Sequence, residues 1–204
     1  KQYGVPLYVT KTLLFLNKTM MKEAGIEKNP ESFDEMMSMA EKMTGEGKSG
    51  FMTLNFDWLY WPLFKLNGID FVNEDMTEAA FNTPEAVALV ERLADLTGKG
   101  VIDKISWTGR WVEPNGAFAA GTVGMLHAHA PAYLWFKSKG EWVNEDTVDS
   151  IALPGGWATP NSHSLVISEG SKHPEEAWDF VKIATSGVGA KAMGEGTNNL
   201  TGDK

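Results

Sequence analysis

Apolar residues recur at helical spacing most clearly between Phe33 and Met43, where they stand three or four positions apart. This period matches one face of an α-helix and predicts an amphipathic helix. Ser32 lies just before the segment and Glu35 follows three positions later, which is the capping-box pattern of a helix start. The pattern therefore predicts a helix that begins after Ser32.

Two further segments, 84–98 and 174–187, show the same apolar period. Both open with a proline, and proline is favoured at the first helical position because its missing N–H has no intrahelical partner there. Glycines close both segments, as expected at helix ends. Shorter helices are expected at 17–24, 58–66, 114–120, 131–139 and 188–194.

Short apolar runs lie between these helices and predict strands at 3–9, 12–16, 123–128, 150–153 and 163–168. Strands that alternate with helices indicate an α/β protein. In the run from Val123, the side chains of Met125, His127 and His129 would share one face of an extended strand. Residues 154–162, which open with Pro-Gly-Gly, indicate a connection between two structural units.

Composition and charge exclude several function classes. The formal net charge is −9 and the only arginines are Arg92 and Arg110, so a nucleic-acid partner is not expected. No apolar run is long enough to cross a bilayer. The absence of cysteine excludes disulfides, thiolate catalysis and cysteine-based zinc sites, and no cofactor is expected.

Several short motifs occur in a fixed order over about positions 3–186: Tyr3-Gly4-Val5-Pro6, Leu14-Phe15-Leu16-Asn17-Lys18, Ala24-Gly25-Ile26, 30–35, 81–86, 117–125, 153–156 and 167–180. In this order they resemble the maltose-binding-like solute-binding proteins of ABC importers (family 1, cluster D). The sequence departs from the family pattern at Leu16, where the family commonly has tyrosine. It departs again at Pro131, where the family usually has a sugar-stacking tryptophan.

This resemblance implies an α/β fold of the periplasmic-binding-protein-like type II, in which two lobes hold a ligand between them and close on a hinge. It also implies that the chain is a fragment lacking most of the N-terminal lobe. Residues 1–10 would then be the crossover strand and 11–155 the second lobe. Residues 156–190 would return to the first lobe, and 191–204 would form a tail heading back toward the second.

The family resemblance also implies a function without catalysis. The expected role is to capture a mono- or oligosaccharide and to present it to the permease subunits of an ABC transporter. We expect a monomer in the periplasm or another extracytoplasmic location, with a lipid anchor as an alternative. A polyol or a glycerol-phosphate-type ligand is the alternative to a sugar. The scarcity of arginine argues against a strongly anionic ligand, although Arg110 keeps that possibility open.

The first candidate site is the aromatic and polar run from Asn55 to Trp61. Aromatic faces stack on the C–H-rich faces of sugars, and polar groups satisfy the hydroxyls. We expect Asn55, Asp57 and Trp58 to contact the ligand, with Trp111 at the edge of the cleft. The alternative is that Asp57 only caps a helix and the aromatic residues belong to the core.

A second candidate group is His127-Ala128-His129, with Tyr133 or Trp135 in place of the family's stacking tryptophan. Two histidines on one strand face could bind a metal, but no third ligand is evident. The preferred interpretation is that His129 binds hydroxyl or carboxylate groups of the ligand, while His127 packs in the core.

A third group lies near the two crossings of the chain. In the resembling family, the small polar stretch that contains Ser162 and His163 borders the ligand from the first lobe, and Tyr8 and Thr10 also lie where the chain crosses. An ordinary solvated loop is the alternative for the stretch around Ser162.

Two other function classes are alternatives to ligand transport. A glycoside hydrolase would need two carboxylates that flank one bond, and nothing pairs Asp57 with Glu113. The sequence has no nucleophile elbow, P-loop or dinucleotide fingerprint. The third class is an isolated lobe whose groove binds a protein partner, which predicts no saturation by small molecules.

Overall fold

The computed structural model describes residues 3–197 and 199–201, which divide into two compact units. Unit 1 contains the described residues up to Lys11, His129–Leu134, and those from Pro160 onward. Unit 2 contains Thr12–Ala128 and Trp135–Thr159. The chain therefore passes between the units four times, after Lys11, Ala128, Leu134 and Thr159.

Unit 2 is built on the sheet order β2-β3-β1-β4. Its strands are β1 (Val5–Asn17, shared with unit 1), β2 (Ser49–Met52), β3 (Val123–His129) and β4 (Val148–Ile151). β2 runs parallel to β3, and β4 runs antiparallel to the end of β1. The helices are α1 (Lys18–Glu23), α2 (Phe33–Met43), α3 (Asp57–Leu66), α4 (Pro84–Gly98), α5 (Val112–Ala119) and α6 (Ala132–Lys139, whose first three residues belong to unit 1), with short 3₁₀ turns at Lys104–Trp107 and Pro154–Gly156.

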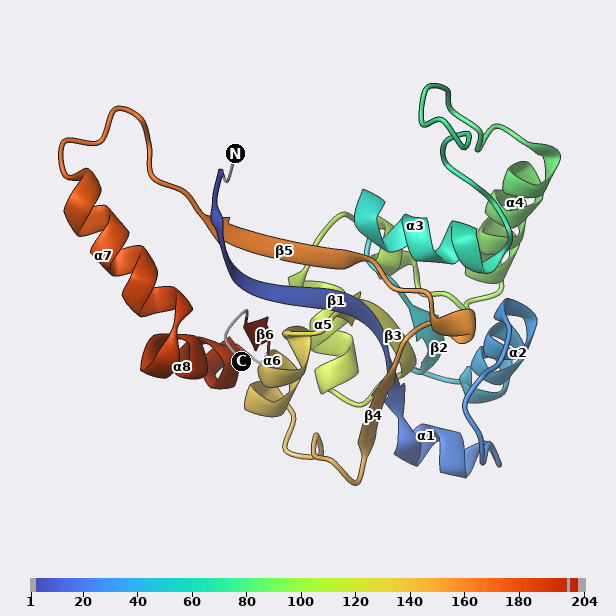
Figure 1. Ribbon diagram of the computed structural model, residues 1–204. Coiled ribbons are helices and arrows are strands. Elements are labelled where there is room, and N and C mark those ends of the chain that lie inside the picture. Colours follow the sequence, from blue (N-terminus) through green and yellow to red (C-terminus); the bar gives the residue numbers. More distant parts are fainter. Residues whose placement is uncertain (1–2, 198, 202–204) are drawn as a thin grey trace. The chain divides into compact units, whose positions relative to one another are not determined.

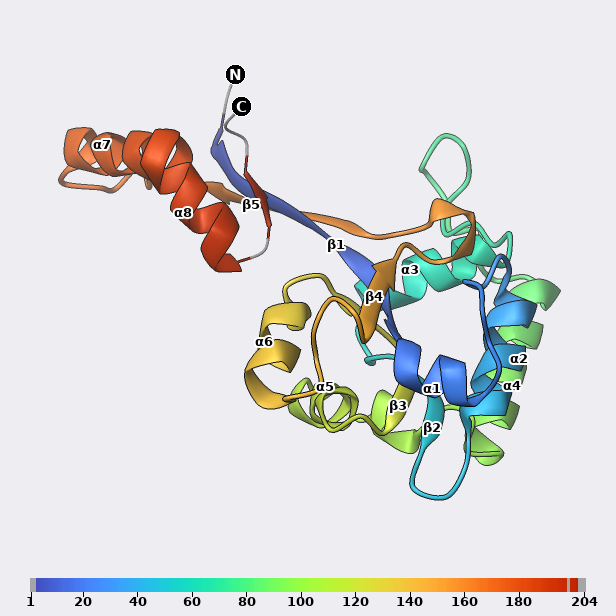
Figure 2. The same cartoon turned by 90° about the horizontal axis from the view of Figure 1, so that it is seen from below.

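The sheet of unit 2 is covered on both faces. Successive side chains of a strand point to opposite faces, and Leu14, Phe15 and Leu16 of β1 are all fully buried. Leu14 and Leu16 belong to the core formed with α1, α2 and α4. Phe15 meets Phe118 of α5 and Phe136 of α6 on the other face. Figure 2 shows these two helix layers on either side of the sheet.

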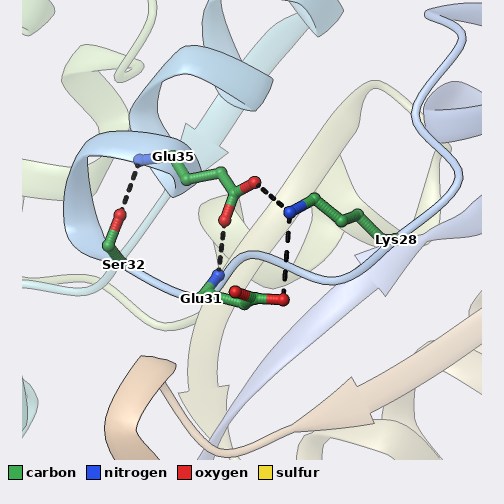
Figure 3. A network of polar contacts seen from close by, with 4 residues as sticks. All are labelled: Lys28, Glu31, Ser32 and Glu35. Atoms are coloured by element: carbon green, nitrogen blue, oxygen red, sulfur yellow. Dashed lines mark hydrogen bonds and ion pairs between the residues drawn. The ribbon is translucent and has the colours of Figure 1, made fainter.

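The start of α2 confirms the predicted capping pattern. Ser32 Oγ accepts a hydrogen bond from the N–H of Glu35 at 3.1 Å. The Glu35 carboxylate accepts one from the N–H of Glu31 at 2.8 Å and pairs with Lys28 at 2.7 Å. The hydrogen bond to Lys28, followed by that to Glu31, lowers the pKa of Glu35. Figure 3 shows that the return bond reaches Glu31 rather than Ser32 itself, one residue earlier than in an ideal capping box.

Helix α2 packs very closely on β2, and Gly50 makes this approach possible. A Cβ atom on Gly50 would lie 1.8 Å from the carbonyl oxygen of Ala40. All four residues of β2 are buried. The sequence pattern does not predict this strand, because a strand buried on both faces shows no alternation of apolar and polar residues.

Unit 1 consists of a small sheet and a helical hairpin. The first half of β1 pairs antiparallel with β5 (Pro160–Leu165), and the two run side by side in Figure 1. β6 (Leu200–Thr201) also pairs with β1, at Tyr8 and Val9. Helices α7 (Pro174–Thr185) and α8 (Gly187–Thr197) pack against each other.

Much of the apolar surface of α7 stays exposed, although its proline start is as predicted. Trp178, Phe180 and Ile183 are all exposed, and Val181 is the buried residue of this helix. Among the residues described, no helix is sufficiently long and apolar to span a membrane.

The strand predictions needed three corrections. The runs expected at 3–9 and 12–16 form one strand, β1, because separate partners pair with its two halves. β4 and β5 begin two or three residues earlier than the predicted strands at 150–153 and 163–168. The stretch around Ser162, for which a solvated loop was the alternative, is part of strand β5.

Candidate functional site

The start of α3 and the start of α5 together build an aromatic cluster on unit 2. Phe56 and Trp58 stack with their ring centroids 5.7 Å apart and their planes at 12°. Trp111 lies 5.0 Å from Phe56 and 5.6 Å from Trp58, tilted by about 30° against both. Trp111 is 41% exposed, and Phe56 and Trp58 are half-buried. The cluster therefore presents ring surface to solvent, and the alternative that these aromatic residues belong to the core is wrong for Trp111.

Polar groups stand beside this cluster and are held in defined positions. The Asn55 side chain donates to the carbonyl oxygen of Trp107 at 3.1 Å and accepts from the Tyr60 hydroxyl at 2.6 Å. Asp57 is exposed, and its carboxylate accepts from the N–H of Trp58 at 2.9 Å. The N-cap of α3 is Phe56, so the interpretation of Asp57 as the capping residue is wrong. As an acid in the first turn, Asp57 interacts favourably with the helix dipole.

Arg110 lies next to Trp111 but is already paired. Its guanidinium donates to the Glu113 carboxylate at 2.9 Å, and both side chains are at the surface. This contact lowers the pKa of Glu113 and raises that of Arg110. An anion at this position would have to compete with Glu113 for the cation.

A second group of predicted residues lies on the sheet of unit 1. Tyr8 on β1 faces His163 on β5, with ring centroids 4.6 Å apart and planes at 30°. Ser162 pairs with Val9 in the same ladder and is exposed. Thr10 is buried, and its hydroxyl has no hydrogen-bond partner among the described residues.

Two more predicted residues belong to unit 1, His129 at the end of β3 and Tyr133 in the first turn of α6. The N–H of Ala130 donates to the carbonyl oxygen of Lys11 at 2.9 Å and fixes the segment between them on β1. Burial lowers the pKa of His129, and the neighbouring charge of His163 lowers it further. Tyr133 is half-buried, and its shielded hydroxyl has no partner among the described residues.

The ten predicted binding residues thus form two groups, one in each unit. Asn55, Asp57, Trp58 and Trp111 belong to unit 2, and the other six belong to unit 1. Trp135, the alternative to Tyr133, packs edge-on against Phe136 in unit 2. Tyr133 is therefore the better candidate for the missing stacking residue.

His127 lies in the core, as expected from its strand position. Its side chain is fully buried, and neither ring nitrogen has a hydrogen-bond partner among the described residues. Burial lowers its pKa from 6.5 to about 3, so the imidazole is neutral at physiological pH. Over the described part of the chain, no group of three or more His, Cys, Asp or Glu side chains is arranged to hold a metal ion.

Two features near the start of α3 were missed by the sequence analysis. Phe56 completes the aromatic cluster, and its position inside the run from Asn55 to Trp61 was the available signal. A pocket of about 680 Å³ lies between α3, α4 and the loop that joins them, and it touches the predicted site at Asp57. The pocket is lined almost entirely by apolar side chains, including Tyr60, Trp61 and Phe64.

Comparison with known proteins gives consistent matches. Residues 1–190 match the family model described as bacterial extracellular solute-binding protein. A probable ABC transporter-binding protein of Deinococcus radiodurans is 24% identical over 203 residues, which cover 91% of this chain and 47% of the relative. The chain therefore spans about half the length of this curated relative.

Solved structures show the same fold. The GacH receptor of Streptomyces glaucescens, studied without ligand and with acarbose, matches with a TM-score of 0.83 and 23% identity, over 98% of this chain and 53% of the receptor. The maltose-bound MalE3 protein of T. maritima matches with a TM-score of 0.79 and 22% identity, over 98% and 54%. The α/β, periplasmic-binding-protein-like fold expected from the sequence is thus confirmed.

Proposed function

Because the chain belongs to the bacterial extracellular solute-binding protein family, whose members bind ligands and are not enzymes, we propose that it captures a carbohydrate for an ABC importer. In this role it presents a mono- or oligosaccharide to the permease subunits on the extracytoplasmic side of the membrane. Unit 2 corresponds to most of the second lobe, and unit 1 to a part of the first.

The observation that supports a sugar most directly is the aromatic cluster of Phe56, Trp58 and Trp111, with Asn55 and Asp57 beside it. Ligand sites combine apolar and aromatic walls with a few fixed polar groups that set orientation. The cluster offers ring faces to the C–H groups of a sugar ring. Asp57 offers acceptor atoms to its hydroxyls, while Asn55 is anchored by Trp107 and Tyr60.

The charges near both groups favour a neutral ligand. Arg110 is occupied by Glu113, and no other arginine lies near the cluster in sequence. The lowered pKa of His129 keeps its imidazole uncharged at neutral pH, so it serves hydroxyl groups better than carboxylates or phosphates. A neutral sugar or polyol therefore fits better than a glycerol phosphate.

Titration of the protein with maltose, acarbose and D-mannitol, followed by tryptophan fluorescence, tests this proposal. Truncating a central tryptophan of a binding site costs about 2 kcal/mol or more. We therefore expect Trp58→Ala to weaken the binding of whichever sugar saturates the parent protein by about 30-fold. Trp178→Ala, which removes an exposed tryptophan of α7 outside the predicted site, is the matched control and should leave the affinity unchanged.

Two results would contradict the proposal. The first is equal affinity in the parent protein and Trp58→Ala for a sugar that binds. The second is turnover of a glycoside that disappears in Asp57→Asn, because it would show chemistry where we propose binding alone.

A further inference from the structure

Helix α3 contains a proline in its interior, and this leaves a gap in the helical hydrogen bonding. In an α-helix each N–H donates to the carbonyl oxygen four residues earlier. Pro62 has no N–H, so it cannot donate to the carbonyl oxygen of Trp58. Nevertheless, α3 runs without interruption from Asp57 to Leu66, and Pro62 is buried.

A threonine far away in the sequence supplies a donor at this place. The hydroxyl of Thr159 donates a hydrogen bond to the carbonyl oxygen of Trp58, across 101 positions of sequence. Thr159 is 6% exposed and Trp58 is half-buried, so this bond is partly shielded from water. The Thr159 hydroxyl therefore donates to the same carbonyl oxygen that an N–H at position 62 would have used.

Thr159 is itself fixed by two hydrogen bonds to Thr12. Its N–H donates to the Thr12 hydroxyl at 2.9 Å, and the N–H of Thr12 donates to the carbonyl oxygen of Thr159 at 3.1 Å. Thr12 is 1% exposed. Thr12 is the first residue of unit 2 after Lys11, and Thr159 is the last residue of unit 2 before Pro160. These two crossing segments are therefore joined to each other and, through one hydroxyl, to α3.

We propose that Thr159 is a positioning residue for Trp58. Its hydroxyl replaces the hydrogen bond that Pro62 cannot make and connects the aromatic cluster to the segments at Thr12 and Thr159, two of the places where the chain passes between the units. The importance of Trp58 for the ligand rests on the proposed function, whereas the link between Thr159 and Pro62 does not. The two residues are therefore energetically coupled. Pro62 removes a backbone donor from α3, and the Thr159 hydroxyl supplies a donor to the same carbonyl oxygen.

The link makes a specific prediction for substitutions. Thr159→Val keeps the shape of the side chain and removes the donor, which leaves a partly shielded acceptor without that partner. We expect this variant to lower the folding equilibrium constant by about tenfold. Thr159→Ser retains the hydroxyl and should stay close to the parent protein. In a Pro62→Ala background the restored N–H satisfies the carbonyl, so Thr159→Val should then have little effect.

A double-mutant cycle in urea, with all four combinations at positions 62 and 159, measures this coupling directly. A second readout follows Trp58 itself, through ¹⁹F NMR of protein labelled with 5-fluorotryptophan and assigned with Trp58→Phe. The Trp58 resonance should move in Thr159→Val and return in Thr159→Ser and in the double variant. The resonance of Trp178 in unit 1 should stay in place in all of them.

The inference would be overturned if Thr159→Val lowered the free energy of unfolding equally in the parent protein and in the Pro62→Ala background. It would also be overturned if the Trp58 resonance did not shift in Thr159→Val. If Thr159→Val fails to fold with Pro62, folding of the double variant supports the link, and failure of both overturns it. These measurements need no sugar. An absence of sugar binding would contradict the proposed function while leaving the coupling between Thr159 and Pro62 intact.

Discussion

Acid should destabilise this protein through one residue of its core, His127. The imidazole is fully buried in β3, and burial lowers its pKa from 6.5 to about 3. Between these two values the unfolded chain takes up a proton that the folded protein does not. Because the unfolded state binds more protons, stability is highest above pH 6.5 and is lost as the pH falls.

The magnitude follows from the size of the pKa shift. Each pH unit between the two pKa values changes the free energy of unfolding by about 1.4 kcal/mol. From pH 7 to pH 4 the loss attributable to His127 is therefore about 3 kcal/mol. This is a large share of the stability of an ordinary domain, which is about 5–15 kcal/mol.

Substitution by leucine, which is similar in volume and has no titrating group, isolates this contribution. Neither ring nitrogen of His127 has a partner among the described residues. His127→Leu should therefore stabilise the protein at pH 7 by about 1–3 kcal/mol, the usual cost of an unsatisfied buried polar group. It should also flatten the loss of stability toward pH 4.

The assay is urea unfolding followed by circular dichroism at several pH values between 4 and 8, on the parent protein and the variant. His173→Leu, which removes an imidazole from the surface at the start of α7, is the matched control. Parallel pH profiles of the parent protein and His127→Leu would refute the reasoning. A clear loss of stability in His127→Leu at pH 7 would show that the imidazole makes a stabilising contact.

Two further substitutions test the packing and the capping of α2. Gly50→Ala would place a methyl group 1.8 Å from the carbonyl oxygen of Ala40, so we expect thermal unfolding to show a loss of about 3 kcal/mol or more, while Gly45→Ala, where a Cβ meets open space, should be nearly neutral. Unchanged stability in Gly50→Ala would mean that α2 and β2 can move apart. Ser32→Ala removes the side-chain acceptor of the Glu35 N–H and should cost about 1 kcal/mol in urea unfolding, with Ser38→Ala on the exposed face of the same helix as the control. Equal effects of the two serine substitutions would argue against the cap.

Local signals in the sequence were sufficient to predict the helices. The start of α2 depends on Ser32 and Glu35, and the starts of α4 and α7 depend on Pro84 and Pro174, all of which act within one helical turn. The pairing of strands that are far apart in the sequence could not be predicted from such local signals. β1 continues through polar residues around Lys11 because partners far away in sequence pair with both of its halves.

The candidate site was predictable as a set of residue types but not as a geometry. The run from Asn55 to Trp61 showed that aromatic and polar groups gather there. Only the structure shows that Trp111 joins them and that Arg110 is already paired with Glu113. The link from Thr159 to the Trp58 carbonyl could not be read from the sequence, because it joins residues 101 positions apart. The division of the chain into lobes expected from the sequence stays a prediction.

Saturation-transfer NMR on mixtures of the protein with maltose, acarbose or D-mannitol tests the central claim most directly. If Trp58 and Trp111 stack on a sugar ring, saturation of the protein must pass to the C–H protons on one face of that ring. We predict this transfer for at least one of the sugars, with recovery of the ligand unchanged. The absence of transfer to any of them from a folded protein, or chemical conversion of the sugar, would contradict the account.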